Sequence, residues 1–276
     1  MAYTPAYEMW RTELRMADKE AIFEVMLDLG YAQDYPLSHL PWFFGVRIPM
    51  TNSNANGQPA EEELTRLNTV ENRIREVVRG REGTFVGRRQ GLGNRDLLFY
   101  FERRPSGLDD RIRASVGMEI LFISKSDPQW QGYEQLLPDE RGVRAIKDGH
   151  TINELVGRNA DPEREHLVIH KVRTANPKAA EKLKEFLADK LGLDDVRVLS
   201  DDGEHLVCGT QRTPLDSLKI GEISYKLELA APKARADYLG WSADPVGDLV
   251  DAAAEADELD LDDLDLDMDD LEDVEV

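Results

Sequence analysis

The side chains most capable of chemistry are one cysteine, Cys208, and five histidines. His166 and His170 are four residues apart, a spacing that places two metal ligands on one face of a helix. They lie in HLVIHKV, however, which alternates like a strand, and on a strand they would be about 13 Å apart, too far to share a metal. Cys208 alternates with Leu206 in a similar pattern, which is typical of a core residue.

Glycine and serine motifs of enzymes are also sparse. The chain contains no HExxH, no cysteine pair and no GxSxG, and QGLGN contains only a GxG between two predicted strands. A tight turn is the simpler interpretation of that loop, because a phosphate-binding loop needs a strand before it and a helix after it. The sequence therefore predicts no catalytic residue, no cofactor and no metal site.

The C-terminal segment DELDLDDLDLDMDDLEDVEV is the most unusual feature. Residues 251–276 hold 14 Asp and Glu and no Lys or Arg. This segment therefore carries two-thirds of the net charge of −21. Disordered segments in which acidic and apolar residues alternate often fold onto a partner, although a purely solubilising tail is the alternative. Its leucines and methionine, which alternate with the acidic residues, are Leu259, Leu261, Leu264, Leu266, Met268 and Leu271. The predicted partner-binding carboxylates are Asp260, Asp262, Asp263, Asp265, Asp267, Asp269 and Asp270.

A basic region lies between Arg73 and Arg113, with 11 arginines and 6 acidic residues. One interpretation is a solvated helix face and strand edges; the other is a patch that binds RNA or the acidic tail. For RNA, the aromatic residues Phe99, Tyr100 and Phe101 would stack on bases. The candidate anion-binding residues are Arg73, Arg79, Arg81, Arg88 and Arg89.

The first half of the chain has mixed helix and strand patterns. Strands are predicted for KEAIFEVMLDL, LPWFFGVRIPM and MEILFISKS, and a hairpin for TFVGRR and RDLLFYF. EEELTRLNTVENRIREVVRG has helical spacing, three glutamates at its start and Gly80 at its end. GLDDRIRASVG indicates a short helix. We expect a small α+β domain over residues 1–137, with helices on one face of a mainly antiparallel sheet.

The pattern weakens over residues 138–163, where one short helical stretch is expected, and this segment is predicted to be a linker. A second domain is expected over residues 164–247. EHLVIHKVRT indicates a strand, and the next segment a helix capped by Asn176, with Pro177 in its first turn and Gly192 at its end. A hairpin around SDDGE and another helix follow, so the order suggests a ferredoxin-like fold that lacks one strand. Residues 248–276 are predicted to be a disordered acidic tail.

Composition favours a cytoplasmic protein. The single cysteine excludes an internal disulfide framework, and no apolar run reaches the roughly 18 residues that a membrane span needs. The N-terminal residues are charged and show no secretory signal.

Two stretches resemble known families. NGQPAEEELTRLNTVENRIREVV, followed by FVGRRQGLGNRDLLFYF, resembles the bacterial domain of unknown function numbered 695. The resemblance covers roughly residues 8–137 and implies an α+β domain without an assigned activity.

The second half, from EHLVIHKVRT to YLGWSADPV, resembles the family of regulator of ribonuclease activity B. That family closes with a tyrosine-x-glycine-tryptophan motif, here Tyr238, Gly240 and Trp241, but Leu239 stands where the family usually has Asp. The resemblance implies a non-enzymatic regulator that binds and inhibits a ribonuclease E-type enzyme. Trp241 is then either a core side chain or an exposed anchor for the partner. The alternatives are an RNA-binding module with the tail as autoinhibitor, and an uncharacterised hydrolase in the first domain.

Overall fold

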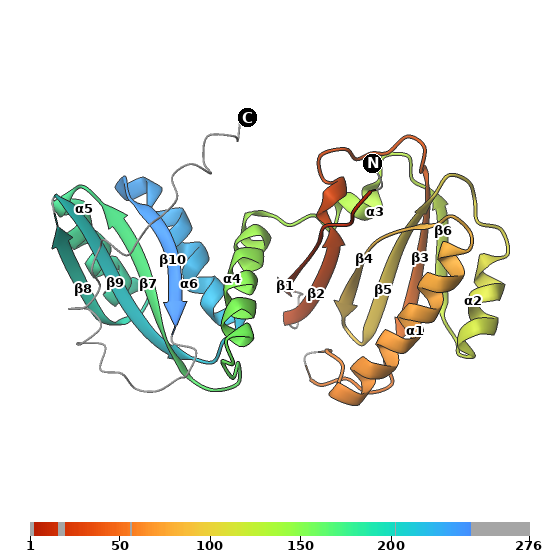
Figure 1. Cartoon of the computed structure of the whole chain (residues 1–276), viewed down its shortest axis with the longest axis horizontal. Helices are drawn as coiled ribbons and strands as arrows, with labels where there is room; N and C mark the ends of the chain where they lie inside the picture. Colours follow the sequence, from red (N-terminus) through yellow and green to blue (C-terminus); the bar gives the residue numbers. More distant parts are fainter. Residues whose placement is uncertain (1–2, 16–19, 56, 202, 244–276) are drawn as a thin grey trace. The chain divides into compact units, whose positions relative to one another are not determined.

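The computed structural model describes residues 3–15, 20–55, 57–201 and 203–243. Over these residues the chain is an α+β protein with two antiparallel sheets, as the sequence predicts (Figure 1). It divides into two compact units. Unit 1 comprises the chain up to residue 153 together with residues 216–234, and unit 2 comprises residues 154–215 and the chain from residue 235. The predicted disordered tail lies outside the described residues.

Unit 1 contains a six-stranded sheet and most of the helices. Its strands are β1 (Tyr7–Arg15), β2 (Glu20–Asp28), β3 (Trp42–Pro49), β4 (Thr84–Gly91), β5 (Asn94–Phe101) and β6 (Leu121–Ser126). Its helices are η1 (Leu29–Tyr31), α1 (Glu61–Arg79), α2 (Leu108–Val116), α3 (Gln131–Glu134), α4 (Glu140–Gly157, whose last turn passes into unit 2), α6 (Ser217–Ala230) and η3 (Pro232–Ala234). None of the helices in the described ranges is long and apolar enough to cross a membrane.

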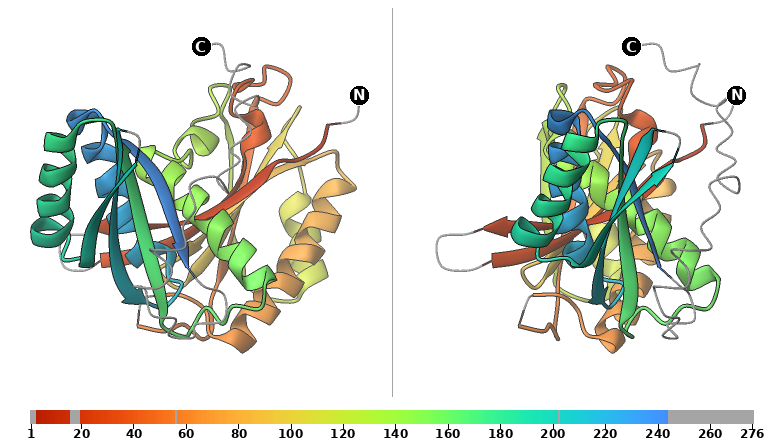
Figure 2. Two further views of the ribbon diagram at one scale, coloured as in Figure 1. Left: turned by 60° about the vertical axis from the view of Figure 1, so that its left-hand side comes forward. Right: turned by 90° about the vertical axis from the view of Figure 1, so that its left-hand side faces the viewer.

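The strand order in this sheet is β1-β2-β4-β5-β3-β6, and every neighbouring pair is antiparallel. The two hairpins, β1–β2 and β4–β5, are local in sequence, and β1 and β2 run side by side in both views of Figure 2. In contrast, β3 pairs on both sides with strands that come later in the chain. The order leaves β1 and β6 as the two edge strands.

Each face of the sheet has its own hydrophobic core. On one face, α1 and α2 pack against alternate residues of β3 and β5, among them Val46 and Phe99 (Figure 1). The other face is covered by Trp130 just before α3, by Tyr133 in α3 and by Ile146 of α4. These side chains pack against the part of the sheet formed by β1, β2, β4 and β5. Helices therefore lie on both faces, whereas the sequence predicts them on one.

The strongest sequence patterns give the expected elements. The helix expected after the acidic triplet is α1, with three glutamates in its first turn and Gly80 as C-cap. The hairpin turn has Leu92 and Gly93 at positive φ, which a glycine adopts without strain. Strand β1 is an addition, because no strand is predicted in the N-terminal segment.

Helix α4 is the largest departure from the predicted elements. It fills 18 residues of the segment expected to be a weakly patterned linker. Its glycines conceal the helical pattern, since glycine disfavours a helix by about 1 kcal/mol relative to alanine. Packing supplies the reason for one of them, because a Cβ on Gly142 would lie 2.8 Å from the Cβ of Pro138.

Unit 2 contains a four-stranded antiparallel sheet with the order β10-β7-β9-β8. Helix α5 contacts β7, β8 and β9, and the Asn176 side chain accepts hydrogen bonds from the amides of Lys178 and Ala179, so the predicted cap is confirmed. The final strand, β10, lies where the sequence predicts no strand. The elements are β7 (His166–Thr174), α5 (Pro177–Glu185), η2 (Phe186–Lys190), β8 (Asp194–Asp201), β9 (Glu204–Thr213) and β10 (Asp237–Ala243).

Candidate functional site

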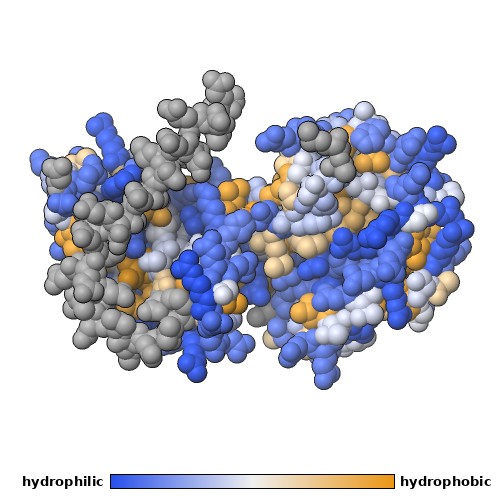
Figure 3. Space-filling view, in the orientation of Figure 1, coloured by the Kyte–Doolittle hydropathy of each residue, from blue (hydrophilic) through white to orange (hydrophobic). Residues whose placement is uncertain are grey.

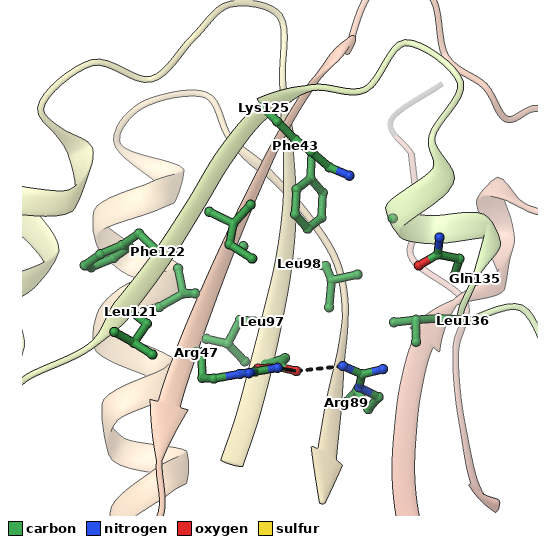
Figure 4. A pocket seen from close by; sticks show the side chains of 15 residues that line it. Phe43, Arg47, Arg89, Leu97, Leu98, Leu121, Phe122, Lys125, Gln135 and Leu136 are labelled. Carbon is green, nitrogen blue, oxygen red and sulfur yellow. Dashed lines mark hydrogen bonds and ion pairs between the residues drawn. The ribbon is translucent and has the colours of Figure 1, made fainter. Parts of the chain in front are cut away.

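The candidate site is a pocket of about 500 Å³ on the α3 side of the sheet in unit 1. It lies over β5, β3 and β6, with Gln135 and Leu136 bordering it after α3 (Figure 4). Its size falls in the range of about 300–1,000 Å³ that ligand pockets occupy. The lining combines an apolar floor with four charged side chains, Arg47, Arg89, Asp96 and Lys125.

Strand register explains how the pocket is built. One row across the sheet pairs Arg89 with Asp96, Asp96 with Arg47, and Arg47 with Leu121. The next row places Gly45 beside Ile123. Gly45 has no side chain. The sheet is therefore hollow in this second row, between the charged row and the row that holds Phe43 and Lys125. A Cβ at Gly45 would lie 3.0 Å from the ring of Phe43, so a larger residue would displace that ring.

The charged side chains of the first row are hydrogen-bonded to one another (Figure 4). Arg47 Nε donates to Asp96 Oδ1 over 2.6 Å, and a terminal nitrogen of Arg89 donates to Asp96 Oδ2 over 2.9 Å. Burial acts to raise the pKa of Asp96, but the two arginines outweigh it and the pKa is lowered. The hydrogen bond from Arg47 to Asp96 also raises the pKa of Arg47. Asp96 is therefore held as a carboxylate, an arrangement suited to binding rather than to proton transfer.

The opposite end of the pocket is apolar and carries one cation. Phe43 lies edge-on to Tyr100, and the ammonium of Lys125 is 5.7 Å from the centre of the Phe43 ring. Three cationic side chains and one carboxylate line the pocket, which gives it a net of two positive charges. The site therefore suits an extended ligand that is both apolar and anionic.

Asp127 fixes the loop that borders the pocket. Its carboxylate accepts hydrogen bonds from the Tyr100 hydroxyl over 2.7 Å and from the amides of Gln131 and Gly132. Burial and the hydrogen bond from its hydroxyl to Asp127 raise the pKa of Tyr100. A Cβ at Gly132 would meet the Phe43 ring at 2.8 Å, so this loop lies directly against the pocket wall.

The five arginines predicted to bind anions do not form one patch. Arg73, Arg79 and Arg81 are exposed on α1 and just after it, and that side of unit 1 is mostly hydrophilic in Figure 3. Arg88 and Arg89 are consecutive on β4 and point to opposite faces: Arg88 pairs with Glu71 of α1, whereas Arg89 pairs with Asp96 in the pocket.

The predicted stacking of RNA bases on Phe99, Tyr100 and Phe101 is wrong. Phe99 and Tyr100 are 0% exposed and Phe101 is 3% exposed, because β5 is a central strand with a core on both faces. These rings cannot reach a base without unfolding of the sheet. Arg95 on the same strand is also fully buried, with hydrogen bonds to Glu71, Asn68 and Gln90.

The tyrosine-x-glycine-tryptophan motif lies in β10. Trp241 is 7% exposed, so it is a core side chain and the exposed-anchor interpretation is wrong. Tyr238 is half-buried, and its hydroxyl is hydrogen-bonded to Nδ1 of His170 over 2.8 Å. Gly240 has φ +96° at a shift in the β10–β7 register, a conformation that favours glycine.

The predicted tail carboxylates, Asp260 to Asp270, lie outside the described residues. Within the described ranges, no group of three or more His, Cys, Asp or Glu side chains could hold a metal ion. His166 and His170 are both buried in β7. Burial raises the pKa of the Cys208 thiol, which makes it a poor nucleophile.

Sequence reasoning missed the pocket residues Arg47, Asp96, Leu121, Ile123 and Lys125. One signal was present: in LFISK, apolar residues and a lysine occupy every second position, which on a strand places them on one face. Nothing in the sequence alone indicates that β6 lies beside β3 rather than β5.

The fold and the pocket define an α+β protein with a ligand-sized site on its first sheet. A family model described as "Family of unknown function (DUF695)" matches residues 10–137, which lie in unit 1 and include all of the pocket. The match supports the predicted N-terminal domain of unknown function. A search of curated proteins gives no match to the chain.

Proposed function

We propose that this chain is a non-enzymatic regulator that binds proteins and uses its acidic C-terminal segment to engage a basic partner. The observation that carries the proposal is the segment itself: 14 carboxylates without one cation, interleaved with apolar residues, in residues 251–276. Carboxylates steer the segment toward a cationic surface, and apolar side chains hold it there. By resemblance, the partner is a ribonuclease E-type enzyme.

The arrangement of unit 2 supports this assignment. From β7 to β10 the element order along the chain is strand, helix, strand, strand, helix, strand, with the second helix, α6, grouped with unit 1, and the sheet order of unit 2 is β10-β7-β9-β8. We take this as a ferredoxin-like arrangement, the one that the predicted order of elements also suggests.

The proposed mechanism is competition for a basic surface. Ribonucleases hold RNA largely through phosphate contacts from Lys and Arg. A bound polyanion occupies those side chains, and RNA is then excluded from the same surface.

The test is cleavage of a labelled RNA by a purified ribonuclease E-type enzyme, with and without an excess of the full chain. We expect slower cleavage with the full chain and recovery of the rate after deletion of residues 251–276. In a matched variant, Leu259, Leu261, Leu264, Leu266, Met268 and Leu271 are replaced by serine while every carboxylate is kept. That variant should inhibit less than the full chain. Equal inhibition by the full and the truncated chains would contradict the proposal.

A further inference from the structure

Strand β6 is an edge that could accept another strand. It pairs with β3 on one side, and within the described residues no strand pairs with its other side. Edge strands are usually protected by charges, by proline or by covering segments, because their free backbone groups can pair with another chain. In β6, however, Leu121 is 66% exposed and Ile123 is 60% exposed.

The exposed side chains of β6 continue the rows of the pocket. Leu121, Ile123 and Lys125 alternate along the strand and line the pocket, beside Arg47, Gly45 and Phe43 of β3 (Figure 4). A strand added outside β6 would extend each row by one residue. Apolar side chains on its pocket side would bury Leu121 and Ile123.

Cations lie on both sides of this edge. Lys125 and Arg47 are on the pocket side. On the helix side, the guanidinium of Arg113 is 4.8 Å from the ring centre of Phe122, and that of Arg104 is 5.9 Å from the ring centre of Trp42. Arg113 also pairs with Asp109 and Asp110, but such solvent-exposed pairs contribute little and can be exchanged. The edge therefore favours an added strand whose pocket face is apolar, to cover Leu121 and Ile123, and whose helix face is acidic, to meet Arg104 and Arg113.

The chain carries a segment of that kind. Residues 264–269 read Leu-Asp-Leu-Asp-Met-Asp, a strict alternation with the period of a strand, and they equal β6 in length. The 20 residues of 244–263 can span up to about 70 Å when extended.

We propose that residues 264–269 add to β6 as a further strand. Leu264, Leu266 and Met268 lie on the pocket side against Leu121 and Ile123. The intervening aspartates lie on the side of Arg104 and Arg113. Backbone hydrogen bonds supply affinity, and the alternating side chains supply register, as in other cases of strand addition. The inference rests on the proposed function, since it gives the same acidic segment a resting site that keeps it from the basic partner.

The first test is disulfide trapping in the full chain after Cys208→Ser removes the only cysteine. Ile123→Cys is combined in turn with Leu264→Cys, Leu266→Cys and Met268→Cys. The matched control replaces Ile123→Cys with Val143→Cys, a position on α4 that is 43% exposed. We expect at least one of the three Ile123 pairs to oxidise about tenfold faster than its control, as neighbouring residues on paired strands can. Equal rates for all three pairs would overturn the proposal. A link within one chain or between two copies supports it equally.

The second test is amide hydrogen exchange in β6. The variant Leu264→Asp/Leu266→Asp/Met268→Asp removes the apolar face but keeps the segment acidic. It should raise exchange of the outward-facing β6 amides by about tenfold. The control Leu271→Asp/Val274→Asp/Val276→Asp, just beyond the alternating run, should leave them unchanged. Unchanged exchange in both variants would overturn strand addition, whereas the ribonuclease test reports separately on the proposed function.

Discussion

Glu63 is a buried carboxylate held by several donors. The amide and hydroxyl of Thr51 donate to it over 2.9 and 2.8 Å, and Arg66 donates through two nitrogens. The hydrogen bonds from Arg66, with those from Thr51, outweigh burial and lower the pKa of Glu63 from 4.5 to about 2. Glu63 ties the start of α1 to the chain after β3.

We expect Glu63→Gln to lower the free energy of unfolding by about 2 kcal/mol at pH 7. Because the folded-state pKa is depressed, this stabilisation is complete above about pH 4.5. It is lost as the pH falls toward 2. Urea unfolding of both proteins at pH 7, 4 and 2.5 measures the difference, which should shrink at each step. Glu61→Gln, in the same turn of α1 but exposed, is the control and should have little effect. A difference independent of pH would contradict the assignment.

The arginines show why the candidate site is hard to predict from residue types. Counting charges correctly finds a basic region, but each arginine has a role set by its strand face. Arg88 and Arg89 differ by one position and serve different faces, and Arg95 is buried in the core. The pocket depends on Arg47, Asp96 and Lys125 meeting across three strands. That meeting follows from sheet order, which local patterns do not encode.

Elements with a strong local signal are predicted well. Helix α1, the β4–β5 hairpin and α5 with its Asn176 cap have clear periodicity and end signals. Elements stabilised mainly by tertiary contacts are missed. Helix α4 contains two internal glycines and an irregular pattern, but Ala145 and Ile146 pack into the core of unit 1. Its burial compensates for its poor helix propensity.

The Asn176 cap gives a prediction at the scale of one element. Its side chain accepts from the amides of Lys178 over 3.0 Å and Ala179 over 3.3 Å. Asn176→Ala should lower the free energy of unfolding of unit 2 by about 1 kcal/mol, since two amides lose their acceptor. Asn176→Asp keeps an acceptor and should cost a few tenths of that. Hydrogen exchange of the β7 and β9 amides, measured at increasing urea concentrations, gives the free energy of unfolding of unit 2 in each variant. Equal loss in both would show that the cap is not the cause.

At the scale of the whole molecule, charge is concentrated at one end of the chain. Deleting residues 251–276 removes 14 carboxylates and changes the net charge from −21 to −7. The remaining chain is an ordinary, mildly acidic protein, and strong attraction to a basic partner would come from the deleted part.

We therefore expect binding to a basic, RNA-binding peptide to weaken steeply with salt for the full chain. The truncated chain should show a much flatter dependence, because fewer ion pairs are screened. Isothermal titration between 50 and 300 mM salt measures both slopes. A full-length chain with every tail aspartate replaced by asparagine and every tail glutamate by glutamine is the control and should match the truncated slope. If the slope does not change on truncation, the tail is not the charged contact.

The place of β3 in the sheet has a consequence for how the protein is made. Both neighbours of β3, β5 and β6, follow it in the chain. When Trp42–Pro49 emerges during synthesis, its partner strand β5 is complete only after about 50 further residues, which at 5–20 residues per second takes roughly 3–10 s. For that interval a segment reading WFFGVRIP has no partner strand. Nascent chains of this protein should therefore depend on chaperones most strongly in the window between the synthesis of residue 49 and that of residue 101.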